Sequence, residues 1–479
     1  MVQCLTSPAS VPDLRPRDFH YTRYHHWPTI SKLHNSFLEL TLHTQTLIDQ
    51  QLRLLDSAKV LVTPPYHASI MAMPPKKRCH AYYHKGSFGK MGGSLIYSDW
   101  PCCYRRLSVG STITLSLFSS VVDTSHTPLR NMETHIDAHS QLIKCLRAQP
   151  VSVPNLLPIF SSWPGAVNPH WRALVPVINA RIDSLFPEPV KATKLKRCDF
   201  AHLAATRWPL AGFKELYILA FLSLWLVTWD DQIDDDTKDS LSNNFEAAEQ
   251  YRRETLYFVA QCLDLDLTEG LPRSYKDSIF VPDDPIVQSF DVIGEALRDA
   301  YTYEQRHGFL KEMSLFLVTS HMEQKAKLEG QIPSPEVYWR VRMGTSAVGV
   351  ICAVNEYSLR SVIPRAIMED YDMRAIWNEV NVIVSIVNDI YSLKKEMAQD
   401  SIYSLIPILC MSLGSPQAAI DNAIRSLIQS VGRFNVAANR LMDGIEEEDR
   451  FSLSLGVKRD VEDFIRSCQF NCTGSLYWT

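Results

Sequence analysis

Two clusters of acidic and polar residues, about 150 residues apart, each directly follow a long apolar segment of this chain. The first cluster begins at Asp230, where the apolar residues 217–229 end, and the second begins at Asn388, where the apolar residues 380–387 end. An apolar helix that ends in charged residues places them where a buried interior opens to water. The chain is therefore expected to carry two polar clusters to the edge of an apolar core.

Within each cluster, polar residues recur at every fourth position. Asp230 and Asp234 are four residues apart, and Asn388, Ser392 and Glu396 repeat the same step. Positions i and i+4 of an α-helix differ by only ~40° in direction, so each set lies along one helix face. Carboxylate, amide and hydroxyl oxygens suit a hard divalent cation such as Mg²⁺. Both sets are therefore candidate metal ligands.

Together the two clusters resemble the metal-binding motifs of class I terpene synthases. The first reads DDQID from Asp230 and matches the aspartate-rich DDxxD motif, and the second reads NDIYSLKKE from Asn388 and matches N-D-x-x-S-x-x-K-E. The pair in this order is far more specific than a lone acidic run. The resemblance covers about residues 151–479 and is closest to fungal sesquiterpene cyclases. It implies an all-α fold, the class I terpenoid synthase-type helical bundle around an apolar active-site cavity.

The resemblance also implies a reaction and its cofactor. In this family, Mg²⁺ ions, three to each active site, help an allylic diphosphate to leave its carbon skeleton as free diphosphate. The expected substrate is farnesyl diphosphate, and the expected product is a cyclic sesquiterpene. Carried over to this chain, Asp230 is a metal ligand with Asp234 beside it, and Asn388, Ser392 and Glu396 chelate one Mg²⁺.

Two further positions match the family's diphosphate-binding residues. Lys395 immediately precedes Glu396, where relatives contact diphosphate, and Arg342 lies 46 residues before Asn388, where they carry a diphosphate-sensing arginine. Arg340 is the competing candidate for the sensor. The sensor precedes a break in an active-site helix, and we expect Gly344 and Gly349 to supply that break because glycine is unfavourable inside helices.

The carboxyl-terminal end matches the family only in part. Trp478 lies 90 residues after Asn388, where relatives place an aromatic residue of the substrate cavity. Relatives usually add an Arg-Tyr pair a few residues later, but this sequence stops at Thr479. We therefore expect a catalytic domain that is truncated at its C-terminus.

The remaining sequence from residue 168 onward shows helical periodicity and no convincing strand. Four helices are expected to start with a capping side chain followed by proline, a pair that satisfies free backbone N–H groups without losing a hydrogen bond. These pairs are Asn168-Pro169, Asp284-Pro285, Ser334-Pro335 and Ser415-Pro416.

Charge divides the chain into two parts. Residues 1–148 hold 16 Lys and Arg against 9 Asp and Glu, whereas residues 149–479 hold 32 against 44. Eleven of the 15 histidines also lie in the first part. This asymmetry predicts a boundary near Gln149. We expect residues 1–148 to be a poorly ordered or non-native extension, with a genuine accessory domain as the alternative, and residues 149–479 to be the catalytic domain.

Composition also limits the compartment and the partners. The longest apolar run has about thirteen residues, which is too short to span a bilayer, and no signal peptide is evident. None of the 11 cysteines forms a CxxC pair, so we expect reduced thiols in a cytoplasmic protein. We expect a prenyl diphosphate substrate, no nucleic acid, no stable membrane insertion, and a monomer or homodimer.

Three alternatives remain open at this point. A chain-elongating prenyltransferase is disfavoured because such enzymes carry a second aspartate-rich motif, and none is found here. A non-catalytic, truncated pseudoenzyme would keep the helical fold without turnover. A cyclase that uses geranylgeranyl or geranyl diphosphate would carry the same motifs.

Overall fold

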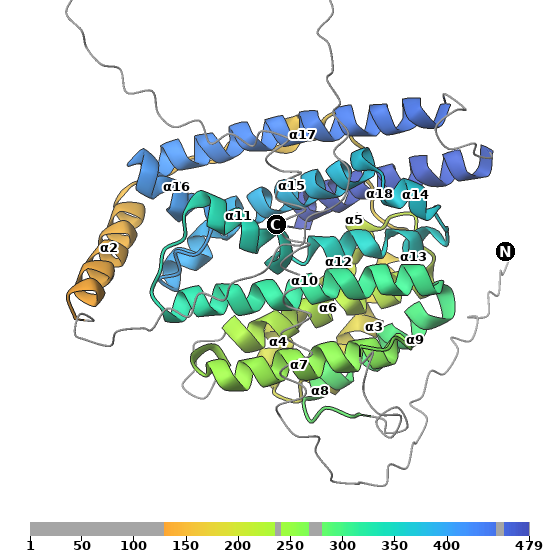
Figure 1. Cartoon of the computed structure of the whole chain (residues 1–479), viewed down its shortest axis with the longest axis horizontal. Helices are drawn as coiled ribbons and strands as arrows, with labels where there is room; N and C mark the ends of the chain where they lie inside the picture. Colours follow the sequence, from red (N-terminus) through yellow and green to blue (C-terminus); the bar gives the residue numbers. More distant parts are fainter. Residues whose placement is uncertain (1–128, 235–240, 268–279, 447–454, 479) are drawn as a thin grey trace, which may run out of the picture. The chain divides into compact units, whose positions relative to one another are not determined.

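The computed structural model describes residues 129–234, 241–267, 280–446 and 455–478, and all regular elements in these ranges are helices (Figure 1). The prediction of an all-α fold is confirmed. The helices are α2 (Leu129–Ala148), α3 (Trp171–Leu185), α4 (Pro189–Arg197), α5 (Phe200–Arg207), α6 (Phe213–Asp234), α7 (Phe245–Cys262), α8 (Pro285–Gln288), α9 (Phe290–Ala300), α10 (Tyr303–Leu328), α11 (Pro335–Thr345), α12 (Val348–Ala353), α13 (Asn355–Leu359), α14 (Arg365–Met368), α15 (Tyr371–Ala398), α16 (Leu405–Leu413), α17 (Pro416–Glu446) and α18 (Leu455–Trp478), with short 3₁₀ turns at Leu157–Phe160 and Leu241–Asn243.

Three of the four expected helix starts lie where the sequence predicts them. The Asp284 carboxylate accepts the N–H groups of the second and third residues of α8, and Ser334 and Ser415 accept one N–H each at the start of α11 and α17. The fourth is wrong by two residues, because α3 begins at Trp171. Asn168 instead stabilises the preceding turn by accepting the His170 N–H.

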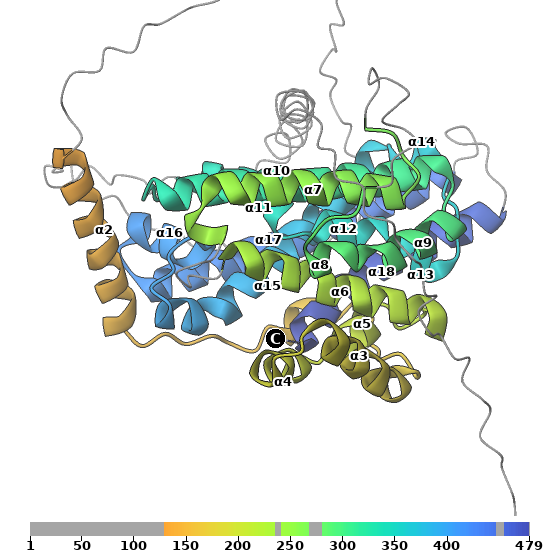
Figure 2. The ribbon, with the colours of Figure 1, turned by 90° about the horizontal axis from the view of Figure 1, so that it is seen from below.

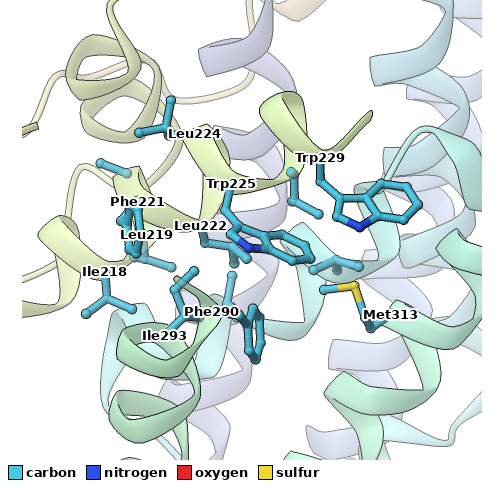
Figure 3. Packing of buried hydrophobic residues seen from close by; sticks show 14 of the residues in the cluster. Ile218, Leu219, Phe221, Leu222, Leu224, Trp225, Trp229, Phe290, Ile293 and Met313 are labelled. Atoms are coloured by element: carbon cyan, nitrogen blue, oxygen red, sulfur yellow. The ribbon is translucent and has the colours of Figure 1, made fainter. Parts of the chain in front are cut away.

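Helix α6 forms part of the core and is buried on nearly all sides. Its Trp225 and Trp229 side chains point toward the neighbouring helices (Figure 3), and the Trp225 ring meets Phe290 edge to face at 5.2 Å. Both indole N–H groups donate to acceptors inside the core, at the Ile286 carbonyl and the Thr255 hydroxyl. Within the described ranges, α6 is the helix whose length and composition would allow it to cross a membrane. Its burial identifies it as a core helix.

Helix α15, which carries the second cluster, lies against α17 and α18, while α10 lies between α7 and α11 (Figures 1 and 2). Two ion pairs fix α15 against α17. Arg433 Nε lies 2.6 Å from Glu379 Oε1, and Arg440 Nη2 lies 2.6 Å from Asp372 Oδ1. The partners follow opposite orders along the two helices, so α15 and α17 are antiparallel. Because both carboxylates are buried, this pairing sets the register of the helix that carries Asn388.

Helix α2 belongs to the part of the chain that precedes the predicted boundary at Gln149. Its Leu142 and Leu146 side chains are buried, and Arg147 lies 2.7 Å from Asp400 in the turn after α15. The boundary itself stays a prediction, since residues 1–128 lie outside the described ranges.

The close contact of α18 with α5 at Gly474 allows a test of this packing. A Cβ on Gly474 would lie 2.6–2.7 Å from backbone atoms of Thr206 and Arg207 in α5, whereas a Cβ on Gly432 in α17 would meet nothing within 4 Å. We expect Gly474→Ala to lower the free energy of unfolding by about 1–3 kcal/mol, because backbone must shift. Gly432→Ala should raise it by about 0.5–1 kcal/mol. Urea unfolding measures both, and equal effects would contradict the packing described.

Candidate active site

The last turns of α6 bring the first cluster to a small cavity of about 50 Å³. Asp230 is half-buried and Asp234 is exposed. Both line the cavity, together with side chains from α10 and α11. The other lining residues are Ser320, Glu323, Gln324, Arg342 and Thr345.

Three carboxylates line this cavity, those of Asp230, Asp234 and Glu323. The pKa of Asp230 is raised well above its usual value, first by burial and then by the negative charges of Asp234 and Glu323. Burial would also raise the pKa of Glu323, but the ion pair with Lys327, the positive charge of Arg342 and hydrogen bonding together outweigh burial and lower it. Lys327 Nζ lies 2.8 Å from Glu323 and 2.9 Å from Asp234. The carboxylates therefore lack compensating positive charge mainly at Asp230.

Arg342 connects this cavity to the second cluster. Its Nη2 donates to Asn388 Oδ1 at 2.7 Å and to Asp389 Oδ1 at 2.8 Å, both on α15. The pKa of Arg342 is raised despite its burial, because Asp389, Tyr338 and other nearby acidic groups stabilise the charged form. Arg342, and not the competing Arg340, is thus the arginine that lies between the two predicted sets of ligands.

Asp389 holds this arginine in place through a buried ion pair. Its side chain is buried, and its second oxygen accepts the Tyr338 hydroxyl and the Leu405 backbone N–H, the latter at 2.7 Å. Asp389 therefore joins α11, α15 and the start of α16 in one network. These three donors occupy most of the roughly four acceptor sites of the carboxylate, so Asp389 acts within the protein network, in line with its position off the Asn388 face of α15.

The rest of the second cluster is held by hydroxyl groups. Ser392 Oγ donates to Glu396 Oε1 at 2.5 Å, and Ser404 Oγ donates to Glu396 Oε2 at 2.5 Å. Burial, followed by the Asp389 charge, raises the pKa of Glu396. Lys395, the residue before Glu396 on α15, is exposed. Asn388, Ser392 and Glu396 thus lie along one helix face, with two of the three already linked by a hydrogen bond.

The helix break after the arginine is present, but the expected glycines do not supply it. Helix α11 ends at Thr345, α12 begins at Val348, and Ala347 between them has a left-handed φ of 54°. Gly344 serves close packing instead, because a Cβ there would lie 2.2 Å from Thr319 Oγ1 on α10. Gly349 likewise approaches Glu312. The prediction was wrong because it considered helix propensity alone and not the contact with α10.

Asn381 on α15 stabilises the break from the opposite side. Its Nδ2 donates to the Met343 carbonyl at 2.7 Å, and its Oδ1 accepts the Ser346 hydroxyl at 2.9 Å. An interrupted helix leaves carbonyl groups without partners, and one buried amide here satisfies one of them. Helix α15 therefore fixes Arg342 at two points, through Asp389 at its side chain and through Asn381 at the backbone that follows it.

Trp478, the predicted cavity aromatic, lies at the end of α18 and is half-buried. Its indole N–H donates to the Cys198 carbonyl at 2.6 Å. Cys198 directly follows the last residue of α4, so this hydrogen bond ties the end of α18 to the end of α4. It does not line the 50 Å³ cavity.

Three residues of this site were not found from the sequence: Glu323, Lys327 and Ser404. A Glu and a Lys four residues apart on a helix form the commonest kind of exposed ion pair, so their spacing carries no functional signal. Ser404 lies beyond the end of α15, and only the turn after that helix brings its hydroxyl to Glu396.

The donor set fits a divalent metal ion. In the described part of the chain, no three His, Cys, Asp or Glu side chains converge as a ready-made metal cluster. The candidate ligands are instead divided between α6 and α15, on two sides of Arg342, and include amide and hydroxyl oxygens. Such oxygens suit Mg²⁺, which usually binds few protein groups and completes its shell with water and phosphate.

Comparison with known families agrees with this arrangement. Residues 222–431 match the model of terpene synthase family 2, which is described as C-terminal metal binding. The matched range includes both clusters and Arg342. The chain is 35% identical to sesquiterpene cyclase hepA of Aspergillus oryzae over 336 residues, which cover 70% of this chain and 88% of that protein. It is 26% identical to terpene cyclase braA of Annulohypoxylon truncatum, covering 76% and 92%.

Solved structures share the fold. Hedycaryol synthase superposes with a TM-score of 0.56 at 19% identity, covering 69% of this chain and 98% of that one. Germacradien-4-ol synthase from Streptomyces citricolor superposes with a TM-score of 0.54 at 16% identity, covering 69% and 97%. At these identities the similarity establishes the architecture of the helical bundle.

The Asp389 network predicts a large effect on stability. Asp389→Asn would turn an NH₂ group toward at least one existing donor and remove the buried negative charge that faces Arg342. We expect a loss of about 3–5 kcal/mol in the free energy of unfolding. Asp400→Asn, which breaks an exposed ion pair just after the same helix, should lose about 1 kcal/mol or less. Thermal and urea unfolding measure both, and a loss at Asp389 no larger than at Asp400 would contradict the network.

Proposed function

The chain belongs to the class I terpene synthases, and we propose that it ionises farnesyl diphosphate with Mg²⁺ and cyclises the product to a sesquiterpene, releasing diphosphate. The observation that carries this proposal is the position of Arg342 between the two oxygen-rich clusters, in contact with Asn388. The names of two similar proteins, a sesquiterpene cyclase and a terpene cyclase, support the substrate class.

The reaction needs a site that stabilises a departing polyanion. Mg²⁺, when bound, would neutralise the charge that develops on the leaving diphosphate. Asp230 and the set Asn388, Ser392 and Glu396 would hold the metal from two sides, with Asp234 next to the first. This division of the candidate ligands between α6 and α15 supports the binding of both metal and diphosphate at this site.

Protein cations complete the site. Arg342 has an Nη2 that already donates to an amide oxygen of the second cluster, so a small movement would aim the guanidinium at a diphosphate oxygen. Planar guanidinium groups bind such oxygens in pairs. Lys395, exposed beside Glu396, offers a second positive charge at the water-facing side.

We propose a cytoplasmic location for the enzyme, which the absence of disulfides among the seven described cysteines supports.

Purified protein incubated with farnesyl diphosphate and Mg²⁺ should release a cyclic C15 hydrocarbon or alcohol, detected by gas chromatography–mass spectrometry. The Asn388→Ala/Glu396→Ala variant should lose roughly 100-fold or more of this rate, because electrostatic stabilisation of a leaving anion contributes effects of that size. Removal of metal with EDTA should abolish product, and added Mg²⁺ should restore it.

Lys394→Ala is the matched control, since Lys394 is exposed on the same helix and lies outside the candidate ligand set. It should keep the wild-type rate. Product from geranyl or geranylgeranyl diphosphate alone would correct the chain length and keep the cyclase. No product from a folded sample with any of the three diphosphates would overturn the proposal in favour of a non-catalytic protein.

A further inference from the structure

Lys327, in the last turn of α10, joins two carboxylates with one ammonium group. Its Nζ lies 2.9 Å from Asp234 Oδ1 at the end of α6 and 2.8 Å from Glu323 Oε1, one turn earlier on α10. Asp234 belongs to the aspartate-rich cluster at which the proposed function places metal. A protein cation therefore contacts a carboxylate oxygen of this cluster.

This ion pair is accessible to water. The Lys327 side chain is 28% exposed and its partner Asp234 is 46% exposed. The nearby Arg252 is different, because its side chain is fully buried and bonded to Glu249, Ser320 and Gln324. Because water reaches both partners, ions from solution can compete with the ammonium group for the carboxylate. An ion from solution can therefore replace Lys327 at its carboxylate partner, whereas Arg252 is not accessible to such replacement.

The displaced ammonium group has a position to move to. Its Nζ lies 6.0 Å from the ring centre of Tyr403, in the turn that follows α15. The four-carbon stem of lysine is flexible, and an aromatic face attracts a cation. Tyr403 directly precedes Ser404, which binds Glu396 of the second cluster. A shift of Lys327 toward this ring would move its charge away from Asp234 and toward the second cluster.

Arg342, which lines the cavity, cannot take over the position of Lys327 without breaking its own contacts. Arg342 Nη2 is bonded to both Asn388 and the buried Asp389. The carboxylates that line the cavity are Asp230, Asp234 and Glu323, so Lys327 is the positive group directly paired with two of the three. A divalent ion carries twice the charge in a small volume and attracts a carboxylate more strongly than an ammonium group does.

We propose that Lys327 is a built-in counter-ion that holds Asp234 before metal arrives, and that metal binds at the first cluster by displacing its ammonium group. This inference rests on the proposed function, because it requires metal to bind beside Asp234. Lys327 is then a positioning residue. It holds the acidic end of α6 against α10 before metal binds, and it sets the metal concentration at which the site binds metal.

The test uses Mn²⁺, which takes the same oxygen ligands and whose free concentration is read from its electron paramagnetic resonance signal. Mn²⁺ is titrated into the substrate-free, full-length protein. Lys327→Met removes the competing charge and keeps most of the side-chain volume. We expect it to bind Mn²⁺ roughly fivefold tighter or more, the size of a coupling between two competing ligands. Lys327→Arg, which keeps the charge, should bind as the wild type does.

Lys325→Met is the control for loss of one positive charge, because Lys325 is exposed on the same helix two residues away. Its affinity for Mn²⁺ should change by less than about twofold, as expected for a screened surface charge. Unfolding temperature gives a second readout. Without metal, Lys327→Met should unfold at a lower temperature than wild type, and saturating Mn²⁺ should raise its unfolding temperature by more.

Unchanged or weaker Mn²⁺ binding by Lys327→Met would overturn the inference. Weaker binding of inorganic diphosphate at unchanged Mn²⁺ affinity would assign Lys327 to the anion and overturn it as well. If neither wild type nor Lys327→Met binds Mn²⁺, the metal site of the proposed function fails, and the inference fails with it. If both bind Mn²⁺ equally well, the proposed function stands and only the counter-ion role of Lys327 is lost.

Discussion

The buried contact of Arg342 with Asp389 is the interaction on which the rest of the site depends. It joins α11 to α15 in the interior, and the same carboxylate holds Tyr338 and the start of α16. A buried carboxylate with three donors and an arginine partner is strongly destabilised when either partner is lost. Because Asn388 lies next to Asp389 on α15, this pair also sets the distance between the guanidinium and the second cluster.

Several parts of this architecture follow from local sequence. The spacing of Asp230 and Asp234, and of Asn388, Ser392 and Glu396, fixes a common helix face, because a helix repeats its direction nearly every four residues. The caps at Asp284, Ser334 and Ser415 also depend on neighbours within three residues. The site as a whole does not. Lys327 reaches Asp234 across 93 residues and Arg342 reaches Asn388 across 46, so only the fold, or a resemblance to a known family, can connect them.

The helix break shows why local propensity is an incomplete guide. Glycine is unfavourable in helices, which pointed to Gly344 and Gly349, yet Ala347 adopts the left-handed conformation. Asn381 and the close contact with α10 determine the backbone there, and the two glycines are needed because a Cβ would collide with α10. Tertiary contacts of this kind outweigh the intrinsic preference of a single residue. The chain thus interrupts its helix beside Arg342 by packing.

In the proposed function, both clusters bind metal around one diphosphate, on either side of Arg342. The most direct measurement is anomalous diffraction from a crystal grown with Mn²⁺ and inorganic diphosphate. We expect anomalous peaks beside Asp230 and within the set Asn388, Ser392 and Glu396, with diphosphate between them in contact with Arg342. Diphosphate bound without Mn²⁺ at either cluster, or Mn²⁺ bound elsewhere while Arg342 keeps its contact with Asn388, would contradict it.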